Sequence, residues 1–173
     1  ISANLQIRNI KESDTIILRN NSEPIIQNSA ENIVIQDNDV VIQNYKSYAH
    51  PKDGVVIYKI SYKGKSLVYA TDKESYLGGD KKLIDFAKNC NLLIHDAQYT
   101  TEDYQSSISP KQGYGHSTFD MALDVQRKTG AEKLVFFHFD PSYDDAKLNS
   151  IKVLYENEQS AQMAKEGLQI DLI

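Results

Sequence analysis

Leu92-Leu93-Ile94-His95-Asp96 is a short apolar run that ends in two ionisable side chains, and Leu134-Val135-Phe136-Phe137-His138 repeats this pattern. Runs of this length without polar alternation are typical of strands that are covered on both faces, as in a parallel sheet. Between them, a helical stripe follows Ser117-Thr118 and stops at Gly130. These residue types cap the two ends of a helix. The order strand, helix, strand predicts a β-α-β unit of an α/β protein.

The rest of the chain extends this pattern. A hairpin is predicted over Val55–Tyr62 and Ser66–Ala70, which turns at Lys63-Gly64-Lys65. The other predicted strands are Leu5–Arg8, Thr15–Leu18, Ile33–Ile35, Val40–Ile42 and 168–172, and the other predicted helices are a short one around 83–87 and a long one from about 143 to 165. A β-rich first half therefore leads into an alternating second half. Without a repeat or a break in composition, we expect residues 1–173 to form a single domain with sheets inside and helices outside.

Composition excludes several classes of protein. A chain of 173 residues can bury one core, and its net charge of −5 argues against tight, sequence-independent binding of nucleic acid. It does not exclude an enzyme that contacts nucleic acid at one metal site. The single cysteine, Cys90, permits neither an internal disulfide nor a cysteine-rich zinc site. No apolar run approaches the roughly 20 residues of a membrane span, and no signal peptide is visible. We therefore expect a cytoplasmic protein without a membrane partner.

The four histidines all lie at the end of an apolar run or in a turn, and two aspartates follow the same rule. The residues of this kind are His50, Asp72, His95, Asp96, His116 and His138. Side chains at the carboxyl ends of strands meet at one edge of an open α/β sheet. Imidazole and carboxylate together suit Zn, Mn or Fe. The pattern therefore predicts a metal or acid–base centre on one rim of the sheet.

Each of these residues also has an ordinary structural interpretation. His50 precedes a proline, which is common in turns, and an aspartate such as Asp72 at a strand end is often the N-cap of a helix. His116 lies just before a predicted helix and could contribute to its N-terminal cap. Asp96 could orient an imidazole rather than bind an ion. Taken singly, these residues leave both interpretations open.

Taken in order, the sites resemble a known family. The stretch from Tyr48 to Asp145 resembles the carboxyl-terminal half of the metallo-β-lactamase-fold hydrolases. It is most similar to the branch that contains phosphodiesterases, tRNA 3′-end-processing endonucleases and cyclic phosphoribosyl phosphodiesterases. The matching pieces are His50-Pro51 with Gly54–Ile60, then Val68–Glu74, Leu92–Tyr99, Gly113–Thr118 and Leu134–Pro141. Five pieces in the family's order are far more specific than any one of them.

The resemblance implies an αββα sandwich and a role for each residue. It makes His50 and His138 metal ligands and Asp72 the carboxylate that bridges two metal ions, which would be Zn, with Mn or Fe as alternatives. It makes His116 the histidine that contacts the scissile phosphate and can protonate the leaving oxygen, with Asp96 either as its carboxylate support or as an acid that stabilises the fold. Hydroxide activated by the two metal ions would attack the phosphorus of a cyclic nucleotide, a small phosphodiester or an RNA end.

One departure from the family is clear: the signature His-x-His-x-Asp-His is absent, and no histidine precedes His50. We therefore expect this chain to be the carboxyl-terminal portion of a longer hydrolase, with an incomplete sandwich, without its amino-terminal metal-binding segment, and inactive by itself. The alternative is a degenerate, non-enzymatic module used for binding or structure, and a homodimer is open in either case. Thioester or lactam hydrolysis is disfavoured, because the element Gly115-His116-Ser117-Thr118 is associated with the phosphodiester branch.

Overall fold

The computed structural model describes residues 9–20, 22–27, 34–76 and 78–172. The strands are β1 Thr15–Leu18, β2 Ile25–Gln27, β3 Val40–Ser47, β4 Val55–Tyr62, β5 Lys65–Ala70, β6 Leu92–Asp96, β7 Lys133–Phe137 and β8 Ala161–Met163. The helices are α1 Lys81–Phe86, α2 Thr101–Tyr104, α3 Phe119–Thr129 and α4 Asp145–Leu154. Within these ranges, no helix is long and apolar enough to cross a membrane.

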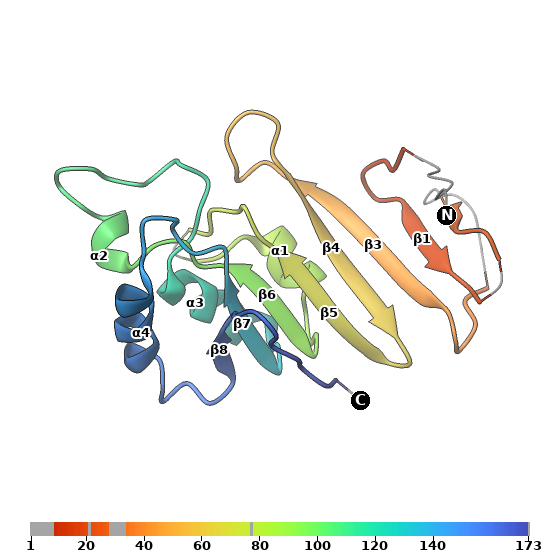
Figure 1. Ribbon diagram of the computed structural model, residues 1–173. Helices are drawn as coiled ribbons and strands as arrows, with labels where there is room; N and C mark the ends of the chain where they lie inside the picture. Colours follow the sequence, from red (N-terminus) through yellow and green to blue (C-terminus); the bar gives the residue numbers. More distant parts are fainter. Residues whose placement is uncertain (1–8, 21, 28–33, 77, 173) are drawn as a thin grey trace, which may run out of the picture.

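All eight strands belong to one mixed sheet with the order β2-β1-β3-β4-β5-β6-β7-β8 (Figure 1). The pairs from β2 to β5 are antiparallel, whereas β5, β6, β7 and β8 run parallel to their neighbours. Parallel neighbours need crossover connections, and α1 and α3 provide them between β5, β6 and β7. The carboxyl ends of β5, β6 and β7 therefore lie at the same edge of the sheet.

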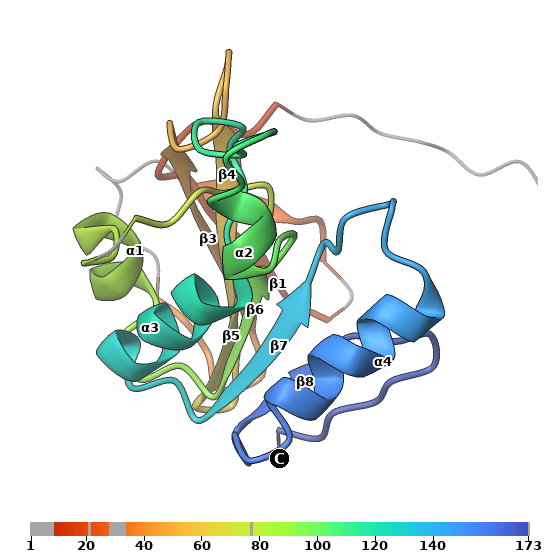
Figure 2. The same ribbon diagram turned by 90° about the vertical axis from the view of Figure 1, so that its left-hand side faces the viewer.

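Helices α1 and α3 cover one face of this sheet (Figure 2). Val68, Leu93 and Leu134 lie on this face in register, and all are fully buried with the inner side of α3. Helix α3 begins as expected, because the side chain of Thr118 accepts a hydrogen bond from the Met121 N–H. It ends at Gly130 in the left-handed conformation (φ 69°). The predicted β-α-β unit is confirmed.

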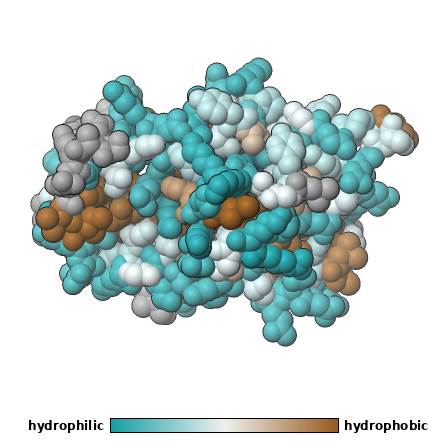
Figure 3. Space-filling view, turned by 180° about the vertical axis from the view of Figure 1, so that it is seen from behind, coloured by the Kyte–Doolittle hydropathy of each residue, from teal (hydrophilic) through white to brown (hydrophobic). Residues whose placement is uncertain are grey.

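The opposite face of the sheet keeps apolar side chains partly exposed. The strand register places Tyr69, Ile94 and Val135 on this face, and Phe137 and Val56 follow by the alternation of β7 and β4. Val56, Tyr69 and Phe137 are exposed to 39%, 37% and 38%, although Val135 is buried. Seen from behind, where α1 and α3 lie, the surface is mostly hydrophilic (Figures 2 and 3). The described residues thus supply one sheet with one helix-covered face, which is part of the expected sandwich.

The carboxyl-terminal prediction is wrong in two places. The helix expected over 143–165 is α4 alone, which ends at Leu154, and Tyr155 then packs against Phe119 and Phe136. The chain turns and forms β8, which extends the sheet beside β7. No strand forms over 168–172. Edge pairing with β7 satisfies main-chain groups that a longer helix would have satisfied within itself.

The amino-terminal prediction is correct only in part. Strand β1 has the predicted bounds, and β3 begins at the predicted Val40 but runs further. Strand β2 at Ile25–Gln27 was not expected. Val34 and Ile35 are exposed and form no strand, and both Ile33 and the stretch Leu5–Arg8 lie outside the described residues.

A buried carboxylate fixes the loop between α2 and α3. Glu74 is 2% exposed, and its side chain accepts hydrogen bonds from the Gly113 and Gly115 N–H groups and from the Tyr104 hydroxyl. Gly115 has φ 91°, and a Cβ at this position would lie 2.7 Å from Cδ2 of the His50 side chain. The loop is therefore fixed by Glu74 and packed against His50.

We expect Glu74→Ala to destabilise the protein by about 3 kcal/mol, because it leaves several buried donors without an acceptor. Urea unfolding with an unchanged m-value would measure this loss. Glu132→Ala is the matched control, since Glu132 is exposed and a surface substitution should change stability by no more than about 0.5 kcal/mol. Equal stability of the two variants would show that Glu74 does not hold the loop.

Candidate metal centre

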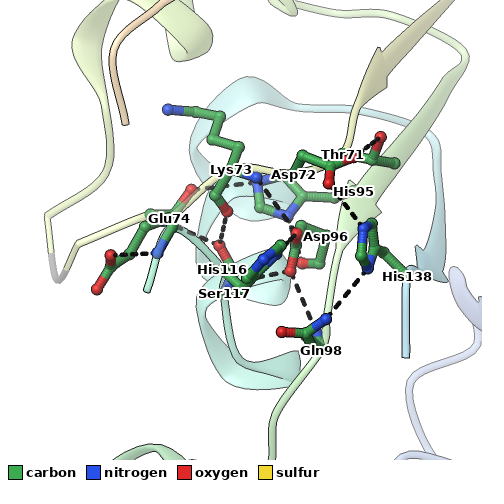
Figure 4. Close-up of polar contacts among 12 residues, drawn as sticks. Thr71, Asp72, Lys73, Glu74, His95, Asp96, Gln98, His116, Ser117 and His138 are labelled. Atoms are coloured by element: carbon green, nitrogen blue, oxygen red, sulfur yellow. Dashed lines mark hydrogen bonds and ion pairs between the residues drawn. The ribbon is translucent and has the colours of Figure 1, made fainter. Parts of the chain in front are cut away.

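Five segments bring ionisable side chains to one edge of the sheet, and Figure 4 shows Asp72, Asp96, His116 and His138 among them. Asp72 lies just beyond β5, Asp96 ends β6, and His138 directly follows β7. His50 comes from the connection between β3 and β4, and His116 comes from the loop before α3. Three of these positions follow from the parallel order of β5, β6 and β7, because neighbouring parallel strands end at the same edge.

The distances are short enough for shared binding of an ion. Nε2 of His138 lies 2.8 Å from Oδ1 of Asp72. One ligand atom each of His50, Asp72 and His116 lie within 4.8 Å of one another, and the same holds for Asp96, His116 and His138. Ligand atoms of a zinc ion lie about 2 Å from it, so such groups can surround a common ion. This imidazole and carboxylate set fits Zn, Mn or Fe.

His116 lies at the centre of the group. Its ring centroid is 5.3 Å from that of His50 and 4.9 Å from that of His138. Asp72 lies close to both of the other histidines: one of its carboxylate oxygens is within 4.8 Å of a ring nitrogen of His50, and Oδ1 hydrogen-bonds to His138. That Asp72 bridges two metal ions remains a prediction. The assignment of His50, Asp72 and His138 as metal ligands remains a prediction.

Two of these residues have an unusual backbone. Asp72 has φ 53° and His138 has φ 64°, in the left-handed region that residues other than Gly seldom occupy, although Asn, Asp and His do so more often than the rest. Both lie where a central strand has just ended. Such conformations cost of order 1–3 kcal/mol and cluster at functional sites. The backbone therefore turns these two side chains toward each other at an energetic cost.

The carboxylate of Asp96 organises the segments beneath the site. It is fully buried; Oδ1 accepts hydrogen bonds from the Ser117 and Gln98 N–H groups, and Oδ2 accepts from the Lys73 N–H and from Nδ1 of His116 at 2.8 Å. The bond to Nδ1 leaves Nε2 of His116 as the nitrogen available for other contacts. Burial opposes a positive charge on His116, but the contact with Asp96 outweighs it and raises the pKa of His116 above its ordinary value.

His95 does not lie on the rim with the other histidines, contrary to expectation. Its side chain is fully buried, and its Nδ1 donates to the main-chain oxygen of Asp96. Nε2 then accepts from the Ser75 hydroxyl, so the ring is neutral, and burial lowers its pKa. In β6, His95 pairs with Ala70 and Phe136 on the helix-covered face. His95 therefore connects the Asp96 main chain with Ser75 on the helix-covered side of the sheet.

Some contacts were not predicted from the sequence. The Gln98 amide lies 3.3 Å from Nδ1 of His138, on the side of the ring away from Asp72. The Ser117 hydroxyl donates to the Lys73 main-chain oxygen and accepts from the Ser75 N–H. The sequence signal for them was their position: Gln98 lies two residues after Asp96, and Ser117 directly follows His116. The capping role left open for His116 is performed by Thr118.

The sequence of the chain is similar to ribonuclease Z proteins. It is 30% identical over 116 residues to ribonuclease Z of Prochlorococcus marinus (strain NATL1A), which covers 63% of this chain and 33% of that protein. It is 36% identical over 84 residues to ribonuclease Z of Thermoplasma volcanium, which covers 48% of this chain and 25% of the relative. The chain thus spans about a third or less of these relatives. No protein-family model matches it.

The fold is similar to solved metallo-β-lactamase fold proteins. The short form of human tRNase Z aligns with a TM-score of 0.56 at 19% identity, over 81% of this chain and 46% of that chain. The metallo-β-lactamase fold protein YhfI of Bacillus subtilis aligns with a TM-score of 0.55 at 20% identity, over 75% of this chain and 47% of that one. A diphosphatase of the PhnP family aligns with a TM-score of 0.52 at 17% identity, over 81% and 46%.

The sequence and structure comparisons agree with each other. The structures share the fold over less than half of their own length, and the sequence matches cover a similarly partial stretch of their relatives. The predicted resemblance and the α/β class are confirmed. This chain carries part of a metallo-β-lactamase fold, and its sequence resembles the ribonuclease Z branch of the proteins that share this fold.

Proposed function

We propose that this chain forms part of a metal-dependent phosphodiesterase. One observation carries the proposal: the Asp72–His138 contact and the Asp96–His116 contact lie side by side at one edge of the sheet. The similarity to ribonuclease Z supports a phosphodiester substrate. The candidate substrates are an RNA end, a cyclic nucleotide and a small phosphodiester.

His50, Asp72 and His138 would hold the metal, with Asp72 shared between the two sides of the site. A ligand atom of Asp72 lies within 4.8 Å of one of His50, Oδ1 of Asp72 lies 2.8 Å from Nε2 of His138, and this mixture of imidazole and carboxylate fits zinc. Bound zinc supplies Lewis acidity that stabilises the charge developing on phosphorus and lowers the pKa of a bound water. Mn and Fe are alternatives with the same donor preference.

His116 would move a proton. Asp96 accepts a hydrogen bond from Nδ1 of His116, which fixes the ring and keeps that nitrogen protonated. Nε2 of His116 is then the atom that donates a proton to the leaving oxygen. The contact with Asp96 favours the charged imidazolium, which is the form that can donate. Asp96 acts through His116 and so is a positioning residue.

We further propose that residues 1–173 belong to a single metallo-β-lactamase-like domain whose remaining metal ligands come from a separate amino-terminal segment with the His-x-His-x-Asp-His signature. The open sheet face around Tyr69 and Phe137 supports this, because a second layer can pack there. The same face also supports the alternative of a non-enzymatic module that associates through it, including as a homodimer. A cytoplasmic location remains a prediction.

Two variants should distinguish metal binding from proton donation. In the whole protein, His116→Ala should keep its metal content and lose about 10²–10⁴-fold in phosphodiester hydrolysis, the range expected for a lost general acid. Asp72→Asn, which keeps the shape of the side chain but removes its charge, should lose metal and activity together. Metal analysis and hydrolysis of bis(p-nitrophenyl) phosphate measure the two effects.

Asp124→Ala is the control for these variants, because Lys128 is the one ion-pair partner that Asp124 has in the described part of the chain, and Asp124 is not among the buried residues of α3. It should resemble the wild type in both measurements. Loss of metal in His116→Ala would make His116 a ligand, and unchanged turnover would remove it from the mechanism. Absence of hydrolysis in the wild type with metal bound would favour the non-enzymatic alternative.

Zinc binding should depend on the length of the chain. Residues 1–173 alone should bind zinc weakly or not at all, because His50, Asp72 and His138 come from separate segments and supply only part of the ligands of a two-metal site. His138→Ala should weaken that binding further, whereas Asp124→Ala should not change it. Calorimetric titration with zinc measures both. Tight binding of two zinc ions by residues 1–173 would contradict the proposed amino-terminal ligands.

A further inference from the structure

Lys111, beside the site, has aromatic partners but no anionic one among the residues that the structure describes. Nζ of Lys111 lies 5.5 Å from the ring centroid of Tyr114 and 6.0 Å from that of Tyr99. Its Nζ also donates a long hydrogen bond of 3.4 Å to the Ser109 hydroxyl. Within the described ranges, no carboxylate lies within ion-pair distance of it. Its charge therefore remains available to an anionic ligand.

The aromatic partners connect Lys111 to the centre of the site. Tyr99 is buried, and its ring meets that of His116 edge-on at 6.2 Å. Tyr114 lies two residues before His116 and is 56% exposed. The loop that carries both residues projects between α2 and α3 on the same side as the turn between β3 and β4 (Figures 1 and 2). Lys111 and Tyr114 therefore lie at the rim of the site.

This rim is held in place. The Lys111 N–H donates to the Tyr104 main-chain oxygen, and the Tyr114 N–H donates to that of Lys111. The Gly113 N–H, between them, donates to the buried carboxylate of Glu74. A site that is rigid before binding loses less entropy when a ligand arrives. The loop thus presents a cation and an aromatic ring in a fixed arrangement.

We propose that Lys111 and Tyr114 form a subsite for the nucleotide that adjoins the scissile phosphodiester. Lys111 would bind the neighbouring phosphate, and the exposed ring of Tyr114 would stack on a base. Aromatic stacking combined with a cation is how proteins bind single-stranded nucleic acid without reading its sequence. In a chain of net charge −5, a lysine free of carboxylates at this rim also favours the approach of an anionic strand. The subsite rests on the proposed function and extends it from the reacting group to the substrate around it.

The test compares two substrates in the whole protein. Pentauridylate has neighbouring phosphates and bases, whereas bis(p-nitrophenyl) phosphate has neither. Lys111→Ala and Tyr114→Ala should each raise KM for pentauridylate about 10-fold, within the range of one base stack, while kcat changes less than about 2-fold. Turnover of bis(p-nitrophenyl) phosphate should stay at the wild-type value. Lys111→Arg and Tyr114→Phe should restore the affinity for pentauridylate.

Lys63→Ala is the matched control. Nζ of Lys63 also lies over a tyrosine ring, that of Tyr62 at 5.2 Å, but it belongs to the turn between β4 and β5, away from the site. It should leave both substrates unchanged. Lys111→Ala should in addition flatten the dependence of log KM on log salt by about 0.7, the slope for one contact to a single-stranded phosphate. Lys63→Ala should not.

The outcomes separate the subsite from the proposed function. Equal loss on both substrates in Lys111→Ala would mean that Lys111 supports the fold, and no loss on either would remove the subsite. If the wild type hydrolyses neither substrate, the proposed function fails, and binding of fluorescein-labelled pentauridylate then decides the subsite alone. Weaker binding by Lys111→Ala than by Lys63→Ala would support it, and equal binding would overturn it.

Discussion

The buried carboxylate of Asp96 is the interaction on which the site depends. It lies at the end of β6 and accepts hydrogen bonds from the segments after β5, after β6 and before α3. A fully buried charge of this kind is stable only when donors surround it. The fold therefore requires that these segments meet at this point, and the placement of His116 follows from a structural need. The same contact sets the orientation of the ring that would donate a proton.

Local sequence signals predicted the central part of the fold. The strands β4, β5, β6 and β7 and the capped helix α3 have apolar periodicity and end signals of their own, so no distant information was needed. Strand β8 has no such signal, because its three residues become a strand only by pairing with β7. Tyr155 ends α4 through contacts with Phe119 and Phe136, from other parts of the chain.

The site could be predicted to a similar extent and for the same reason. His50, Asp72, Asp96, His116 and His138 were found because strand ends and turns are visible in the sequence, and the structure brings them together. His95 was wrongly expected at the rim. It directly precedes Asp96 in β6, and successive side chains of a strand point to opposite faces of the sheet. The roles of Glu74 and Gln98 depend on partners 39 and 40 residues away, which spacing alone does not reveal.

The left-handed backbone at Asp72 and His138 has a consequence for the sequences that this scaffold can accept. A β-branched residue at either position would have to leave this conformation, which would move the end of β5 or β7. Gly would fit without strain and Asn with little, so substitution of Asp72 or His138 should lead first to those two residues. The fold would then tolerate substitutions that remove the candidate metal ligands. Replacement by a different, larger ligand side chain would require the backbone conformation to change first.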